Sequence, residues 1–408
     1  MGKRRQREGP LKAILWIAGA MALDLQWVSV HAAGVRLESP WDALLPGLGV
    51  FGAAFLLSWG AELAQLEIPQ ALALSFLALI AVLPEYAVDI YFAWTAGKDP
   101  AYVHFALANM TGSNRLLIGL GWPVVILAYW WKARKTHIVL EPSHSIEISA
   151  LLLATIYSLV LPLKGSLSPV DSLFFIGIYA VYVLRASQAH VKEPELEGPT
   201  EFIGSWPVTW RRLATILLFC VAGYTIYIAA EPFAEGLLTT GRNFGIEEFI
   251  LVQWLAPLAS ESPEFIVAVI FALRALPGLS FGTLVSSKVN QWTLLVGMLP
   301  LAFSFSLGGL GAMHLDPRQT EEVFLTSAQS LFAVAVIANF RFSLKEALIL
   351  LVLFSTQLFF FSSVVRYAYA VAYFALALGI IVFSPGQRGG LRSLLQGMMY
   401  FLLMRKQK

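Results

Sequence analysis

Long apolar segments separated by short polar connections recur along the whole chain. A helix needs about 20 apolar residues to cross the roughly 30 Å hydrocarbon core of a bilayer. On that measure the pattern predicts about twelve spans, at residues 12–31, 44–66, 68–97, 101–131, 145–163, 167–187, 209–235, 246–275, 278–307, 321–340, 344–362 and 366–384. The final stretch, 391–408, is short and basic, which is typical of an amphipathic helix on the membrane surface. The expected fold is therefore all-α and polytopic.

The composition agrees with this assignment. Hydrophobic residues make up 58% of the chain and charged residues only 13%, against about 25% charged residues in soluble domains. We expect an integral membrane protein whose partner is the lipid bilayer, with no nucleic-acid partner. The single cysteine, Cys220, and the absence of helical histidine pairs give no support for a disulfide, a zinc site or a bound cofactor. The sequence leaves the oligomeric state open.

The distribution of Lys and Arg predicts an orientation. With the basic N-terminus in the cytoplasm, 20 basic residues fall on the cytoplasmic side and 6 on the other. This asymmetry favours two cytoplasmic termini, and the short loops fit a prokaryotic plasma membrane. The first apolar segment also resembles a cleaved signal peptide, and both interpretations stay open because the downstream topology is the same.

A polar loop divides the spans into two halves. We expect an N-terminal basic segment with an extra span (1–43), a first half (44–187), a cytoplasmic linker (188–207), a second half (208–362), and an extra span with a basic amphipathic tail (363–408).

The two halves contain related motifs. "LIAVLPEYAVDIYFAW" (79–94) and "SESPEFIVAVIFAL" (260–273) each place a Pro-Glu pair inside an apolar helix. Each is followed by a span rich in small and polar residues, "ALANMTGSNRLLIGLG" (106–121) and "FGTLVSSKVNQWTLLVG" (281–297). The expected topology runs the two copies in opposite directions, the plan of secondary transporters whose sites lie where interrupted helices meet.

Each proline should leave a backbone carbonyl free beside a glutamate. Pro84 precedes Glu85, and Pro263 precedes Glu264. A proline within a helix removes one backbone hydrogen bond, and the membrane tolerates this only where the carbonyl faces protein or a wet cavity. The motifs thus predict oxygen ligands near the middle of the bilayer.

Charged groups at membrane depth should face one another. Four acids and two bases at this depth would together cost about 15–20 kcal/mol if they faced lipid. The isolated acids Glu62 and Asp24 are instead expected to be packing groups that accept hydrogen bonds. The candidate ion-binding residues are Glu85, Glu264, Ser113, Ser287, Asp89, Glu261, Ser260, Asn109, Asn114 and Gln291, with Lys288 and Arg115 modulating the charge. Such oxygen-rich surroundings suit Ca2+ or Na+.

These motifs resemble those of the cation/Ca2+ exchanger superfamily, the sodium/calcium exchanger membrane region. Its repeats pair G-T-S-x-P-E with G-x-x-x-G-S-N-x-x-N/D, and the similar stretches here are "AVLPE" (81–85), "SESPE" (260–264), "ANMTGSNRLL" (108–117) and "GTLVSSKVNQ" (282–291). The resemblance implies ten core helices, one extra helix at each end and alternating access. It also implies that Glu85 and Glu264 bind the transported metal ion, aided by Ser113 and Ser287.

The sequence also departs from the family pattern. Ala81 and Val82 replace a hydroxyl pair, while Leu117 and Gln291 occupy the final Asn/Asp positions. Lys288 replaces the Asn of G-S-N. The resemblance therefore implies fewer ion ligands than the family pattern would supply.

The two buried bases have alternative interpretations. The Lys288 ammonium either substitutes for a coupling Na+, with Glu261 as the favoured partner, or forms a structural ion pair. Arg115 either extends toward the membrane surface or pairs with Asp89.

We expect a secondary active antiporter that exchanges Ca2+ against Na+ or H+. One alternative is a carrier of another solute in which Lys288 replaces the coupling cation. Another is a membrane enzyme that uses paired carboxylates. The sequence has no nucleophile elbow, phosphate-binding loop or zinc motif, so we predict that the protein is not an enzyme.

Overall fold

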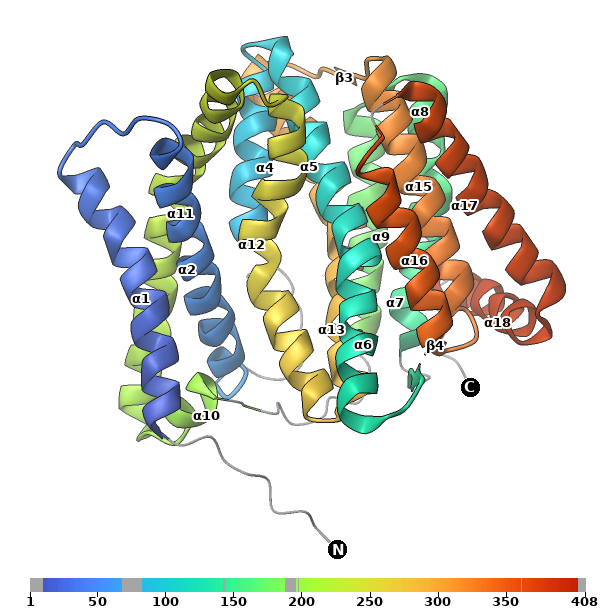
Figure 1. Ribbon diagram of the computed structural model, residues 1–408, viewed down its shortest axis with the longest axis horizontal. Coiled ribbons are helices and arrows are strands. Elements are labelled where there is room, and N and C mark those ends of the chain that lie inside the picture. Colours follow the sequence, from blue (N-terminus) through green and yellow to red (C-terminus); the bar gives the residue numbers. More distant parts are fainter. Residues whose placement is uncertain are drawn as a thin grey trace, which may run out of the picture. The chain divides into compact units, whose positions relative to one another are not determined.

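A computed structural model describes residues 10–67, 83–141, 144–187, 196, 198–360 and 362–402 of the chain (Figure 1). Within these residues, nine helices are long and apolar enough to cross a membrane. The protein is an integral membrane protein, and the all-α prediction is confirmed. Residues 1–9, residues 68–82 (which include Ala81 and Val82), residues 188–195 and 197 of the expected linker 188–207, and the last six residues lie outside the described part.

The chain forms two compact units. The first unit comprises Met1–Val88, Ser187–Leu251 and Leu258–Pro263, and the second comprises Asp89–Ala186, Val252–Pro257 and Glu264–Lys408. Two helices, α4 (Leu83–Ala96) and α12 (Glu248–Leu273), contribute residues to both.

In the first unit, α2 packs closely against two other helices. The unit contains α1 (Pro10–Ala32), α2 (Trp41–Ala64), α10 (Pro199–Gly204) and α11 (Val208–Phe244). A Cβ atom added to Gly52 of α2 would lie 2.7 Å from the carbonyl oxygen of Ala20, and one added to Gly236 of α11 would lie 2.3 Å from that of Asp42. Small residues at these points let the backbones approach, as is usual between helices in membranes.

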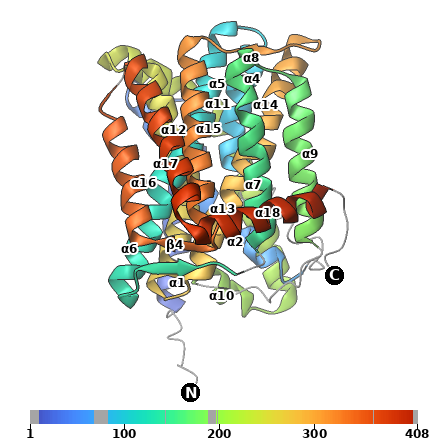
Figure 2. The ribbon, with the colours of Figure 1, turned by 90° about the vertical axis from the view of Figure 1, so that its right-hand side faces the viewer.

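The second unit carries a duplicated helix with a π-helical turn in its middle. The first copy is α5 (Val103–Leu116, 14 residues), the π-helix η2 (Leu117–Gly121, 5 residues) and α6 (Trp122–Ala133, 12 residues). The second copy is α13 (Pro277–Asn290), η4 (Gln291–Leu295) and α14 (Val296–Leu307), with the same three lengths. The copies run in opposite directions (Figures 1 and 2), so the predicted inverted repeat is observed.

The remaining elements of the second unit surround these copies. They are η1 (Pro100–Tyr102), β1 (His137–Val139), α7 (Ser145–Ser158), α8 (Val160–Lys164), β2 (Ser166–Leu167), α9 (Pro169–Ala186), β3 (Met313–His314), α15 (Pro317–Ile337), β4 (Arg341–Ser343), α16 (Leu344–Gln357), α17 (Ser363–Phe383) and α18 (Pro385–Leu402). The strands form two short antiparallel pairs, β1 with β4 and β2 with β3. Each predicted span coincides with one of the observed helices or helix pairs, although the segment expected at 68–97 is described only from residue 83. The last helix, α18, runs across the membrane-spanning helices (Figure 2).

The expected interruption of the second acidic helix is wrong. Helix α12 is continuous from Glu248 to Leu273 and passes through Pro257 and Pro263. Proline has a helix-compatible φ and removes only one hydrogen bond, so the surrounding turns can keep the helical conformation. The irregular backbone lies instead in the following helices, as the π-helical turns η2 and η4.

Candidate functional site

Glu264 contacts one of the predicted serines directly. It lies on α12 immediately after Pro263, and the Ser287 hydroxyl on α13 donates a hydrogen bond of 2.5 Å to its Oε2 atom. Ser287 is buried. A carboxylate and a hydroxyl from two helices thus meet, as the second copy of the motifs predicts.

Equivalent positions in the two copies are 174 residues apart. Ser113 in α5 therefore corresponds to Ser287 in α13, and Asn114 corresponds to Lys288. Ser113 is fully buried, and its hydroxyl donates to the carbonyl of Met110 at 3.1 Å. The duplication has kept the serine in both copies and changed the next residue from an amide to a base.

Lys288 is bound to its own counterpart in the other copy. Its Nζ atom lies 2.5 Å from Asn114 Oδ1 and 3.3 Å from the Asn114 carbonyl oxygen. It also lies 4.4 Å from the centre of the Trp292 ring, a cation–π contact. Lys288 and Asn114 are fully buried. The two oxygens of Asn114 that could coordinate a metal ion, Oδ1 and the backbone carbonyl oxygen, therefore both accept hydrogen bonds from the Lys288 ammonium group.

Asp89 and Asn109 form a further polar contact in the second unit. Both are buried, and the Asp89 carboxyl on α4 lies beside the Asn109 amide on α5, although the two are not aligned as a regular hydrogen bond. The position equivalent to Asn109 in the second copy is Thr283, whose hydroxyl donates to the carbonyl of Leu279 at 2.9 Å. This pair is therefore specific to the first copy.

Gln291 is the first residue of the π-helix η4. Its side chain is fully buried, and neither amide atom has a hydrogen-bond partner among the described residues. Its equivalent in the first copy is Leu117. A buried amide without partners costs free energy unless a ligand or water satisfies it, so Gln291 keeps its place as a candidate ligand residue.

The other three candidates belong to the first unit. Glu85, Ser260 and Glu261 are all buried. Their roles, and the pairing of Glu261 with Lys288, stay predictions. The isolated acids of this unit are packing groups, as expected: Glu62 accepts from Thr200 at 2.7 Å, and Asp24 accepts from Thr225 at 2.8 Å.

Both predictions for Arg115 are wrong. Its side chain is fully buried and forms an ion pair with Glu322 of α15. Gln253 of α12 donates to the same Glu322 oxygen at 3.0 Å, and the guanidinium lies 5.0 Å from the centre of the Trp254 ring. Burial in a low dielectric favours a direct partner over extension to the surface.

The ion pair extends to Arg366 and Glu321, which were not among the predicted site residues. Arg366 of α17 binds Glu321 at 2.8 Å and lies 3.9 Å from Glu322. Arg366 is the first residue of the predicted span 366–384, and its side chain is buried. The paired acids at the start of an apolar segment, "TEEVFL", were the available signal, because two adjacent carboxylates at a membrane span require partners.

Among the described residues, no three His, Cys, Asp or Glu side chains lie close enough to hold a metal ion. The polar groups buried in the second unit include carboxylate, hydroxyl and amide oxygens, at Asp89, Ser113, Ser287, Asn109 and Gln291. That donor set is the one preferred by Na+ and Ca2+.

Comparison with known proteins identifies the family of the chain. The family model described as sodium/calcium exchanger protein matches residues 43–188 and 214–363. A crystal structure of an H+/Ca2+ exchanger, CAX, is 43% identical, with a TM-score of 0.92, and the match covers 97% of this chain and 100% of that chain.

Two further solved structures share the fold at low identity. The Ca2+/H+ antiporter protein YfkE is 14% identical with a TM-score of 0.60, over 89% of this chain and 99% of that chain. The sodium-calcium exchanger NCX_Mj, soaked with Na+ and Ca2+, is 16% identical with a TM-score of 0.50, over 76% of this chain and 95% of that chain. None of the curated proteins matches the chain. The family match and the similarity to CAX show that the chain belongs to the sodium/calcium exchanger protein family.

Proposed function

We propose that the protein is a secondary active antiporter that exchanges Ca2+ for H+ by alternating access. The observation that carries this proposal is the hydrogen bond between Glu264 and Ser287 within an inverted repeat that also preserves Ser113. The 43% identity with an H+/Ca2+ exchanger supports both the cation and the counter-ion. An antiporter of this kind needs no bound cofactor.

The proposed Ca2+ ligands are the two Pro-Glu glutamates and their neighbouring oxygens. Glu85 and Glu264 supply the negative charge, and Ser113 and Ser287 supply hydroxyl oxygens. Asp89, Asn109, Ser260, Glu261 and Gln291 are further candidates. Ca2+ takes about six to eight oxygen ligands, so this set is sufficient without a soft ligand.

The proposed counter-ion follows from the surroundings of Lys288. A carboxylate can carry a proton in one half of the cycle and release it when Ca2+ binds, so Glu264 can serve both ions. A coupling Na+ would require additional free oxygens. The side-chain and carbonyl oxygens of Asn114 instead accept from the Lys288 ammonium at 2.5 and 3.3 Å. Lys288 thus acts as a permanently attached cation where Na+ would otherwise bind.

The test is Ca2+ uptake into proteoliposomes by variants of the proposed ligands. We expect Glu264→Gln to abolish gradient-driven 45Ca2+ uptake and Ser287→Ala to raise KM for Ca2+. Glu62→Gln is the matched control, because Glu62 is also a glutamate in a membrane span but accepts its hydrogen bond from Thr200. Uptake by Glu264→Gln at the wild-type rate would refute the proposed site.

The alternative of a carrier for another solute makes a different prediction. It also uses the fixed charge of Lys288, but it requires that the wild-type protein fail to accumulate 45Ca2+ under any gradient. We also propose that both termini lie in the cytoplasm and that the protein is located in a prokaryotic plasma membrane. Both proposals rest on the distribution of Lys and Arg.

A further inference from the structure

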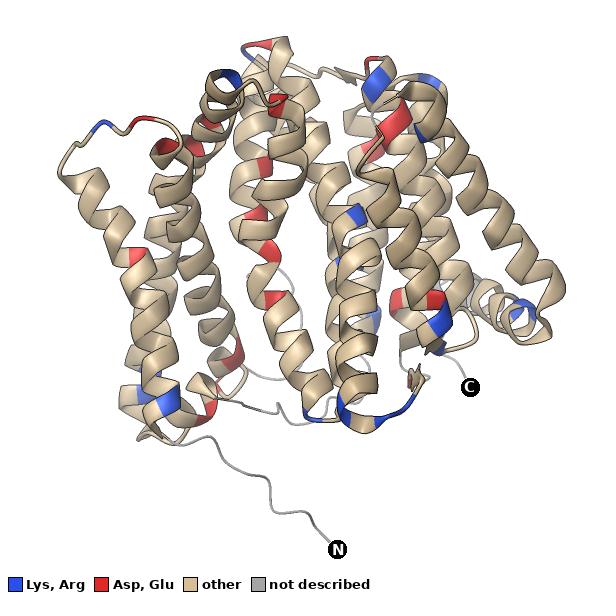
Figure 3. Cartoon of the chain, viewed as in Figure 1, with Lys and Arg blue, Asp and Glu red and all other residues tan. Residues whose placement is uncertain are grey.

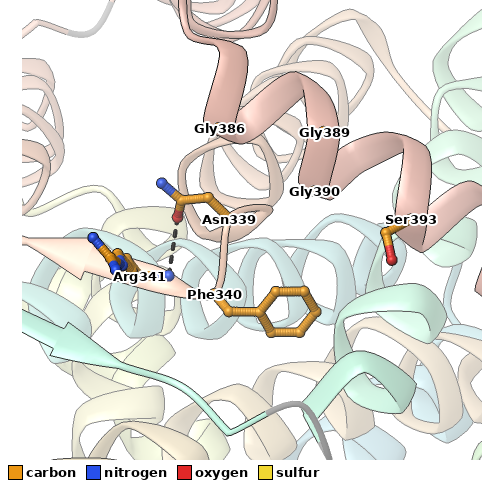
Figure 4. A pocket seen from close by; sticks show the side chains of 7 residues that line it. All are labelled: Asn339, Phe340, Arg341, Gly386, Gly389, Gly390 and Ser393. Atoms are coloured by element: carbon orange, nitrogen blue, oxygen red, sulfur yellow. Dashed lines mark hydrogen bonds between the residues drawn. The ribbon is translucent and has the colours of Figure 1, made fainter.

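A cavity of about 490 Å³ lies beside the last helix of the second unit (Figure 4). One wall is the turn that connects α15 to β4, and the other is the start of α18. Its lining residues are Asn339, Phe340, Arg341, Gly386, Gly389, Gly390 and Ser393. In the close-up, the Phe340 ring lies between Arg341 and Ser393. None of these residues belongs to the proposed ion site.

The cavity lies where two membrane-spanning helices end. Helix α15 ends at Ile337 and α17 ends at Phe383, and both are long and apolar enough to cross a bilayer. The lining residue Asn339 lies two positions after the end of α15, and Gly386 lies three positions after the end of α17. Helix α18 runs across the membrane-spanning helices at this level (Figure 2). A cavity at the ends of two spans is placed at the level of lipid headgroups.

Glycines leave the cavity open without loosening α18. A Cβ atom added to Gly389 would meet no atom within 4 Å, and one added to Gly386 would lie 3.9 Å from the nearest atom, in Asn339. At the edge of the cavity, a Cβ atom on Gly390 would lie 2.0 Å from the carbonyl oxygen of Ala338. Gly390 therefore lets α18 pack against the end of α15, whereas Gly389 faces open space.

The surroundings of the cavity are basic. Arg341 lines it and is exposed, and Arg388 and Arg392 are exposed on α18 close to the glycine face. Lys and Arg also lie at this end of the second unit, at the end of α6 and near β4, where acidic residues stand beside them (Figure 3). The nearby acid Glu346 accepts hydrogen bonds at the start of α16 from the Ser343 backbone at 2.7 Å and from the Ser343 hydroxyl at 2.6 Å, and its single negative charge is outnumbered by the three arginines. The local charge thus favours an anion.

We propose that this cavity binds the headgroup of an anionic phospholipid. The phosphate faces the Arg341 guanidinium and the Ser393 hydroxyl, and Phe340 contacts the apolar part of the lipid. Guanidinium groups suit phosphate because their donors match its oxygens in pairs. The basic residues on α18 add attraction to a negatively charged membrane surface.

The first test measures thermal unfolding of the purified full chain in detergent. Phosphatidylglycerol, phosphatidylcholine or inorganic phosphate is added at equal concentration. We expect phosphatidylglycerol to raise Tm by several degrees, and the other two to have much smaller effects. An equal increase with inorganic phosphate would overturn the lipid proposal in favour of a free anion, and an equal increase with phosphatidylcholine would remove the role of charge.

Two variants act on the cavity in different ways. Arg341→Gln removes the charge, and Gly389→Leu fills the space without a backbone clash. We expect each to reduce the effect of phosphatidylglycerol on Tm to less than half of the wild-type value. The matched controls are Lys98→Gln, an exposed base in the loop after α4, and Gly177→Leu, where an added Cβ also meets nothing within 4 Å. The proposal is overturned if all four variants respond to phosphatidylglycerol as the wild type does.

A second measurement does not depend on variants. Native mass spectrometry of the wild-type protein, purified with a mixture of the two lipids, should show phosphatidylglycerol retained in preference to phosphatidylcholine. Equal retention of both lipids would contradict a headgroup site.

Discussion

The ammonium of Lys288 donates to Oδ1 of Asn114 at 2.5 Å, and the two residues occupy the same position in the two copies of the inverted repeat. A base and an amide thus meet where a symmetric repeat would bring two amides together. The contact occupies oxygens of Asn114 and places a fixed positive charge one residue from Ser287, whose hydroxyl binds Glu264.

Replacement of Lys288 by asparagine should make the transporter sensitive to Na+. The Lys288→Asn variant removes the charge and frees the Asn114 oxygens, so Na+ can enter the vacated position. We expect Na+ to inhibit or drive 45Ca2+ uptake by this variant and to have little effect on the wild type. Lys98→Asn is the control, because Lys98 is exposed. An active Lys288→Asn variant with unchanged Na+ and pH dependence would exclude the proposed role of Lys288.

The buried pair of Arg115 and Glu322 should contribute strongly to stability. Arg115→Ala leaves the Glu322 carboxylate in a low-dielectric interior without its main partner, which typically costs about 3–5 kcal/mol. We expect a large decrease in Tm for Arg115→Ala. The decrease for the double variant Arg115→Ala/Glu322→Ala should be smaller than the sum of the decreases for the two single variants.

The control for this pair is Arg242, which is exposed and pairs with Glu248 at 3.2 Å. Exposed pairs contribute about 0–1 kcal/mol, so Arg242→Ala should change Tm little. Equal effects of Arg115→Ala and Arg242→Ala would contradict the assigned importance of the buried pair.

Close approach of α5 and α12 should make Gly112 intolerant of substitution. A Cβ atom on Gly112 would lie 1.8 Å from the carbonyl oxygen of Gln253, the carbonyl that Pro257 leaves without its helical donor. We expect Gly112→Ala to cost about 1–3 kcal/mol through overpacking. Gly177→Ala has open space and should be neutral or slightly stabilising. Thermal unfolding of the two variants distinguishes them, and equal Tm values would show that the helices separate without cost.

Protonation of Glu67 should weaken the first unit in acid. Hydrogen bonds from Arg211 and then Arg212, together with their charges, lower the pKa of Glu67 from its ordinary value of 4.5. Because the folded pKa lies below the unfolded one, the stabilisation is present above pH 4.5 and is lost as the pH falls through the folded pKa. We expect Glu67→Gln to lower Tm at pH 7 and to have no effect in strong acid.

Glu38 provides the control for this pH dependence, because it is an exposed glutamate in the same unit. Glu38→Gln should leave Tm unchanged at both pH values. A Glu67→Gln effect that is the same at neutral and acidic pH would show that the ion pairs with Arg211 and Arg212 do not cause it.

The sequence predicted the helices well because crossing a bilayer imposes a simple requirement on length and polarity. It also indicated the duplication and the contact between the Pro-Glu motif and Ser287. The continuity of α12 through Pro263 was not predictable, since a proline identifies a missing hydrogen bond and not the conformation of the neighbouring turns. The π-helical turns have no residue signature of their own and follow from packing.

The partners of buried bases were the least predictable part of the site. Arg115 and Glu322 are 207 residues apart, and no local spacing relates them. Lys288 meets Asn114 because of the inverted symmetry, which becomes informative only when the two copies are aligned position by position. The adjacent acids Glu321 and Glu322 indicated that basic partners were needed, but the sequence did not identify Arg115 and Arg366 as those partners.

The most direct test of the proposed exchange is 45Ca2+ uptake by wild-type proteoliposomes under an imposed pH gradient without Na+, compared with an imposed Na+ gradient at equal pH. We expect 45Ca2+ uptake with the pH gradient, accompanied by proton movement in the opposite direction. With the Na+ gradient alone we expect no 45Ca2+ uptake above background. Uptake that requires Na+ and ignores the pH gradient would contradict the account.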